Sequence, residues 1–149
     1  MRVTLHRSAS LDARALSAVR QAALGPLLRD SGDALAVPSR SGLAVRLAGD
    51  GELRSLNARH AGIDAATDVL SFPGEGDWVG DIAISVERAI AQRPEDPAAE
   101  LRLLAVHGLL HCLGFDHGDP VEAARMTGET RRLLPGAAIP DLEAETPTP

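Results

Sequence analysis

The chain has 149 residues, of which 44% are hydrophobic, so it has room for one domain with one sizeable core. Its formal net charge of −6 argues against a protein that coats nucleic acid by charge alone, and its single cysteine, Cys112, excludes an intrachain disulfide framework and fits a reducing cytoplasm. No apolar run approaches the roughly eighteen residues that a membrane helix needs, and the N-terminus lacks the apolar block of a secretory signal.

Strand and helix patterns alternate in the first half of the chain. Residues 3–6 alternate apolar and polar side chains and predict an opening strand. Asp12 is a typical helix cap, and we expect the helix that follows it to end at Gly25-Pro26. Gly42 to Leu47 then predicts a second strand, and Asp50 to Gly62 predicts a helix with its cap at the first of these residues.

Two further strands and then several helices are expected in the second half. Asp68 to Phe72 and Trp78 to Ser85 predict strands that are separated by glycine and proline turn residues. A short helix is expected from Val86 to Gln92. A longer helix is expected from the cap Asp96 to Cys112, where Gly114 provides a left-handed stop.

The last helix and the tail complete the predicted domain. Asp119-Pro120 with Glu122 forms a capping pattern that opens a helix, and Pro135-Gly136 ends it. We expect residues 1–140 to form a single domain and the polar residues 141–149 to be a disordered tail. These elements predict an α/β fold of the α+β type, with a small mixed four-stranded sheet packed against about five helices.

Three of the five histidines lie within the segment HGLLHCLGFDH, from His107 to His117. His107 and His111 are four residues apart on the long helix, so their rings share one face. Gly114 lets the chain turn, and His117 can then reach the same point. Two core histidines held by ordinary hydrogen bonds are the alternative, but three imidazoles at this spacing are typical of a catalytic zinc site with an open position. No catalytic group beyond water on the metal is assigned.

The ligand spacing is that of metzincin proteases, but one residue differs. In those enzymes a glutamate follows the first histidine and acts as the general base, and here that position is Gly108. Met126 falls in the predicted last helix and is a poor candidate for a Met-turn. A metal can still activate water for phosphodiester cleavage, so the pattern favours a nuclease over a metzincin-like metalloprotease.

Three blocks of sequence resemble the YbeY endoribonucleases, which are rRNA maturation factors. They are TDVLSFP at Thr67 to Pro73, GDIAIS at Gly80 to Ser85, and HGLLHCLGFDH at His107 to His117; Leu56-Asn57 also matches. The resemblance implies a zincin-like metal helix and one Zn²⁺ on His107, His111 and His117, for which Ni²⁺ is a possible substitute. It further implies cleavage of single-stranded RNA in the cytoplasm, in 16S rRNA 3′-end maturation and ribosome quality control, with ribosomal or 30S-associated proteins as possible partners.

The sequence departs from the family at one position. The family usually has an arginine six residues before the threonine of TDVLSFP, and this chain has Ala61 there. Arg59 is the nearest substitute and our candidate for substrate binding, although it would point about 160° away on a helix. All fifteen basic residues are arginine, which suits phosphate contacts but also follows from codon bias. A ribosome-associated RNA-binding or assembly factor with a mainly structural metal therefore stays as an alternative.

Two neighbours of the histidines are expected to have roles other than metal binding. Cys112 follows His111 directly, so it points away from the metal and is expected to pack as a small buried hydrophobe. Asp116 precedes His117. It is expected either to orient a histidine ligand from behind or to be a solvated loop carboxylate.

Overall fold

A four-stranded sheet in the order β1-β2-β4-β3 lies at the centre of the computed structural model, which describes residues 1–144. The strands β1, β2 and β4 are parallel, and β3 pairs antiparallel with β4, so β3 is an edge strand of a mixed sheet. Four strands and a mixed sheet were predicted, and both are confirmed. The strands are β1 (Arg2–Arg7), β2 (Gly42–Ala48), β3 (Val69–Pro73) and β4 (Trp78–Ser85).

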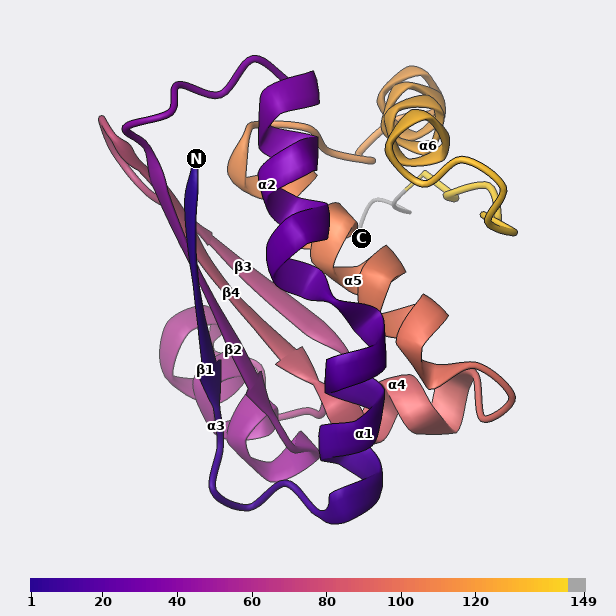
Figure 1. Ribbon diagram of the computed structural model, residues 1–149. Helices are drawn as coiled ribbons and strands as arrows, with labels where there is room; N and C mark the ends of the chain where they lie inside the picture. Colours follow the sequence, from indigo (N-terminus) through magenta and orange to yellow (C-terminus); the bar gives the residue numbers. More distant parts are fainter. Residues whose placement is uncertain (145–149) are drawn as a thin grey trace.

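Six helices in the described residues cover the sheet unequally (Figure 1). The helices α1, α2, α4 and α5 lie on one face, α3 lies on the opposite face, and α6 packs against α5. The helices are α1 (Ala13–Ala22), α2 (Leu24–Ala34), α3 (Asp50–Ala61), α4 (Val86–Gln92), α5 (Pro97–Cys112) and α6 (Pro120–Leu133).

The main core lies between the sheet and the larger helical layer. Leu43, Val45 and Leu47 alternate along β2 and are fully buried beneath the helices. The opposite face of the sheet has only a small apolar cluster, in which Leu53 of α3 contacts Ala48 and Ala83. Because α3 covers only part of that second face, much of the sheet there lies open.

The first helix ends differently from the sequence expectation. Ala23 has a φ of 48°, and its N–H donates to the carbonyl of Arg20, so α1 ends there. Gly25-Pro26 does not end a helix; it lies in the first turn of α2, which was not predicted. Proline is tolerated in a first turn because its missing N–H would have no partner there in any case. The same residues that are typical of a helix end therefore open a second helix.

The helices α5 and α6 begin directly after the capping residues that the sequence predicted. A carboxylate oxygen of Asp96 accepts from the N–H of Ala99 at 3.1 Å, and one of Asp119 accepts from that of Glu122 at 2.8 Å. Met126 lies in α6 and is fully buried, so it supplies no Met-turn beneath the histidines.

The start of the predicted tail is attached to α6. Arg131 forms an ion pair with Asp141 at 2.7 Å, and the N–H of Leu142 donates to the hydroxyl of Thr127 at 3.0 Å. The remainder of that predicted disordered segment, residues 145–149, lies outside the described residues. Within residues 1–144, every helix is too short or too polar to cross a membrane.

Candidate metal centre

The helix α5 presents two imidazole rings one turn apart. His107 and His111 lie on the same face, with their Nε2 atoms 3.0 Å apart and their ring centroids 4.5 Å apart. The remaining faces of this helix half are apolar and buried, as the sequence predicted. Because the other sides of α5 are packed, the direction in which His107 and His111 point is fixed.

The turn after α5 brings the third ring to the other two. Gly114 has a φ of 95°, and the N–H of Phe115 donates to the carbonyl of Leu110 at 3.0 Å, which closes the end of the helix. A positive φ favours glycine because it has no Cβ atom. The ring of His117 then lies 5.8 Å from that of His107 and 5.4 Å from that of His111.

The three rings fit a single divalent ion. One ligand atom from each of His107, His111 and His117 lies within 4.8 Å of the other two. Nitrogen ligands about 2.0–2.1 Å from a tetrahedral zinc are about 3.3 Å from one another, so little adjustment is needed. Three imidazoles leave one position of such a tetrahedron for solvent or substrate. The spacing predicted this convergence, and the residues present could hold a metal.

Burial keeps one of these rings in the form that binds metals. Burial, and then the nearby His111 and His117, together lower the pKa of His107 from 6.5 to about 4. At neutral pH this imidazole is therefore uncharged, with a lone pair available for coordination.

A small cavity of about 180 Å³ opens beside His107, between α5, α6 and the start of β3. Its polar wall includes two carboxylates, Asp68 and Glu100. Glu100 is only 8% exposed; it accepts a 2.7 Å hydrogen bond from Gln92 and pairs with Arg93 at 3.4 Å. The sequence analysis missed Glu100, because one acidic residue in the first turn of a helix is an ordinary favourable charge there.

The two neighbours of the histidines have structural contacts. Cys112 is half-buried against β4, where an added Cβ on Gly80 would lie 2.7 Å from its sulfur. Burial, and then the charge of Asp81, raise the pKa of this thiol from 9.0 to about 11. Asp116 is exposed, and its carboxylate accepts from the backbone N–H of His117 at 2.8 Å, so it holds the loop rather than the ring.

Comparison with known proteins identifies the family. A profile described as Endoribonuclease YbeY matches residues 7–137. The chain belongs to the YbeY endoribonuclease family. The members of this family are named as hydrolytic nucleases that act on RNA, and the resemblance drawn from the sequence is thereby confirmed.

Several YbeY relatives match over most of the chain. An Endoribonuclease YbeY from Chloroflexus aurantiacus is 40% identical over 120 residues, which cover 70% of this chain and 78% of the relative. One from Rhodopseudomonas palustris is 38% identical over an alignment of 154 residues, covering 92% of this chain and 75% of the relative. The solution structure of TM1509 from Thermotoga maritima is 21% identical with a TM-score of 0.56, covering 89% of this chain and 86% of that one, and it supports the fold.

The departure from the YbeY pattern lies at the end of α3. Arg59 and Ala61 are both exposed, two residues apart in the last turn before Gly62. Asn57 is buried on the side of α3 that faces the following loop, where its amide donates to the carbonyl of Ala65 at 3.1 Å. Ala61 lies one turn after Asn57 on that side, whereas Arg59 lies on the far side of the helix. The role of Arg59 in substrate binding stays a prediction.

Proposed function

We propose that this chain is a zinc-dependent endoribonuclease that cleaves single-stranded RNA, with His107, His111 and His117 as the metal ligands. The observation that supports this most directly is the convergence of three imidazoles in a chain of a nuclease family. A bound zinc ion supplies a Lewis acid that activates water and stabilises charge on phosphoryl oxygens.

The protein's own residues would hold and shape this site. The rigid face of α5 fixes the direction of His107 and His111, and the turn at Gly114 delivers His117. Burial holds His107 neutral, so no proton has to leave it before coordination at pH 7. The cavity beside it is lined by the apolar Leu103 and Leu104 of α5 and by the hydroxyl-bearing Thr127 and Thr130 of α6.

We further propose the cellular setting that the family resemblance implies. The substrate would be the 3′ end of 16S rRNA, in maturation and in ribosome quality control, and the location would be the cytoplasm. Ribosomal or 30S-associated proteins would be the partners. The single cysteine suits a reducing compartment.

Cleavage assays test the activity. Zinc-loaded protein, protein treated with a chelator and the His111→Ala variant are each incubated with the same single-stranded RNA. We expect cleavage by the loaded wild type alone, restored to the chelated protein by zinc. Equal cleavage by wild type and His111→Ala would assign the activity to a contaminant.

A second candidate function rests on Ala61. If the missing arginine abolishes turnover, the chain would serve as an RNA-binding assembly factor with a mainly structural metal. That reading requires RNA binding and ribosome co-sedimentation without cleavage, together with loss of fold on chelation. A chelated protein that keeps its circular dichroism spectrum and cleaves RNA again on zinc addition would exclude it.

A further inference from the structure

This chain has few side chains with rings, and most of them lie together in two places. The sequence has five histidines, two phenylalanines, one tryptophan and no tyrosine. Three histidines form the metal centre, and Phe115 lies beneath the guanidinium of Arg125. The other four rings lie on the sheet face opposite the main core, and they are His6, His60, Phe72 and Trp78.

The indole ring of Trp78 packs closely against the neighbouring strand on this face. A Cβ atom on Gly42 of the neighbouring strand would lie 2.8 Å from the indole ring, so the ring lies directly on the backbone of β2. A register shift between β2 and β4 allows Asp81 to share the face, where its carboxylate accepts from the indole N–H at 3.0 Å. The indole is thus held in place, yet it remains 42% exposed.

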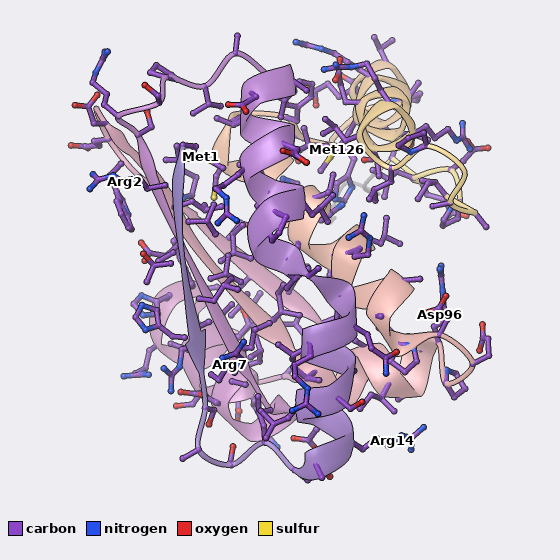
Figure 2. All side chains as sticks on the ribbon, in the orientation of Figure 1. Met1, Arg2, Arg7, Arg14, Asp96 and Met126 are labelled. Carbon is purple, nitrogen blue, oxygen red and sulfur yellow. The ribbon has the colours of Figure 1, made fainter. Side chains whose placement is uncertain are left out.

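A groove of about 440 Å³ continues along the same face towards α3. His60 and Phe72 lie on its wall with their ring centroids 5.0 Å apart, and His6 and Arg46 line it from β1 and β2. Arg2, the register partner of Gly42, points to this face while Met1 points to the helices (Figure 2). Neither Arg2 nor His6 forms an ion pair within residues 1–144, so both are available to a ligand.

The edge strand β3 connects this face to the metal centre. Val69 of β3 lines the cavity beside His107, whereas Phe72, three residues later, lines the outer groove. Three residues of strand span about 10 Å, which is also the distance between packed layers of a sheet structure. An extended chain that leaves the histidines can therefore pass over the edge of the sheet and reach the groove.

We propose that this outer face, defined by Arg2, His6, His60, Phe72 and Trp78, binds the unpaired bases of the RNA strand that extends from the metal centre. The exposed rings of His6, His60 and Trp78 and the partly exposed ring of Phe72 offer stacking surfaces to bases of any sequence. Arg2 offers a cation to the phosphates. This inference rests on the proposed function, because it assumes that the substrate is single-stranded RNA.

RNA fits this surface better than a protein partner does. A protein interface would present a continuous apolar centre, but here the small aliphatic patch of Ala44, Leu56 and Ala83 is interrupted by rings and by charged groups. The net charge of −6 makes a local arginine and stacking rings more important, since the molecule as a whole repels RNA.

Trp78 is the single tryptophan and the chain has no tyrosine, so intrinsic fluorescence reports on the surroundings of this one residue. The chelated full-length protein is titrated with uncleavable 2′-O-methyl RNA. We expect saturable quenching, with an affinity about tenfold weaker in Phe72→Leu and weaker in Arg2→Ala. Phe72→Tyr, which keeps a ring, and Arg14→Ala, on α1 at the opposite side of the molecule (Figure 2), should match the wild type. Unchanged fluorescence at saturating RNA, or unchanged affinity in both test variants, would overturn the proposal.

Cleavage of a long and a short substrate separates this proposal from the proposed function. For RNA of about twenty nucleotides, we expect Phe72→Leu to raise KM about tenfold and leave kcat unchanged. For a substrate of about three nucleotides, which cannot also cover the groove, variant and wild type should be equal. Absence of cleavage by the zinc-loaded wild type, with Trp78 still quenched, would reject the nuclease and keep the RNA-binding face. Cleavage with identical KM in variant and wild type would reject the face and keep the nuclease.

Discussion

Gly108 of α5 packs directly against Ile82 of β4: a Cβ atom on the glycine would lie 2.8 Å from the Cγ2 atom of the isoleucine. Ile82 is 1% exposed, and position 108 faces the sheet rather than the metal centre. The residue after the first histidine is therefore a packing residue, and a glutamate there would be buried without a partner. This contact gives a physical reason why the metzincin arrangement does not apply to this chain.

Replacing Gly108 with alanine should destabilise the protein. Alanine in an ordinary helix interior stabilises by about 0.5–1 kcal/mol, but overpacking a core costs about 1–3 kcal/mol. We expect Gly108→Ala to lower the free energy of unfolding by about 1 kcal/mol in urea titrations. The matched control is Gly128→Ala in α6, where nothing lies within 4 Å and the free energy should rise. Equal effects of both variants would refute the close contact.

Much of the site could be predicted because it depends on local rules. The four-residue separation of His107 and His111 fixes a shared helix face, and Gly114 allows the turn to His117. Neither statement needs knowledge of distant contacts. The caps Asp96 and Asp119 were predicted for the same reason, since each acts on the N–H group three residues ahead.

The parts that the sequence did not reveal depend on long-range packing. Gly108 is explained by its contact with Ile82 of β4, which lies more than twenty residues away in sequence. The packing of Trp78 on Gly42 is a contact between neighbouring strands whose register is shifted at this point. Residue patterns do not encode such a shift. The start of α2 was missed because the left-handed turn is at Ala23, a residue that carries no turn signal.

Zinc should stabilise the wild type through the three histidines. A ligand at one hundred times its dissociation constant stabilises the folded state by about 2.7 kcal/mol. We expect zinc to raise the Tm of the wild type and to leave the Tm of His111→Ala unchanged. The metal content should be about one ion per chain in the wild type and none in the variant. His6→Ala serves as the control, because it removes an exposed imidazole from the opposite face of the sheet. An equal zinc response in His111→Ala would contradict the ligand assignment.

The metal-free protein should lose stability on mild acidification. The pKa of His107 is about 4 in the folded chain and near 6.5 when exposed, so between these values only the unfolded chain binds the proton. The stabilisation is fully present above pH 6.5 and is lost as the pH falls towards 4, by at most about 3 kcal/mol. Urea titrations in chelator at several pH values measure it. The His107→Asn variant should show a smaller slope, and identical slopes would mean that the ring is not buried.

The thiol of Cys112 should react slowly while the protein is folded. Its pKa is raised from 9.0 to about 11, which lowers the thiolate fraction at pH 8 about a hundredfold. We expect alkylation by iodoacetamide to be slower than in urea-unfolded protein by at least that factor. Comparable rates in the folded and unfolded states would show that the sulfur is accessible and that its packing against Gly80 is loose.

The end of α3 offers a gain-of-function test of the departure from the family pattern. Ala61 is exposed on the side of α3 that carries Asn57 and faces the following loop, so an arginine there meets no steric barrier. One charged hydrogen bond to a phosphate is worth about 1.5–3 kcal/mol, and we expect Ala61→Arg to raise kcat/KM for RNA about tenfold or more.

If Arg59 already supplies that contact, Arg59→Ala will lower kcat/KM by a similar factor and Ala61→Arg will restore it in the double variant. Ala61→Lys, a charge without the planar fork, should recover less. Because Arg59 lies on the far side of the helix, a change in kcat/KM of less than about twofold in Arg59→Ala would contradict the prediction that Arg59 binds the substrate. A tenfold loss in Arg59→Ala would instead show that the last turn of α3 unwinds when RNA binds.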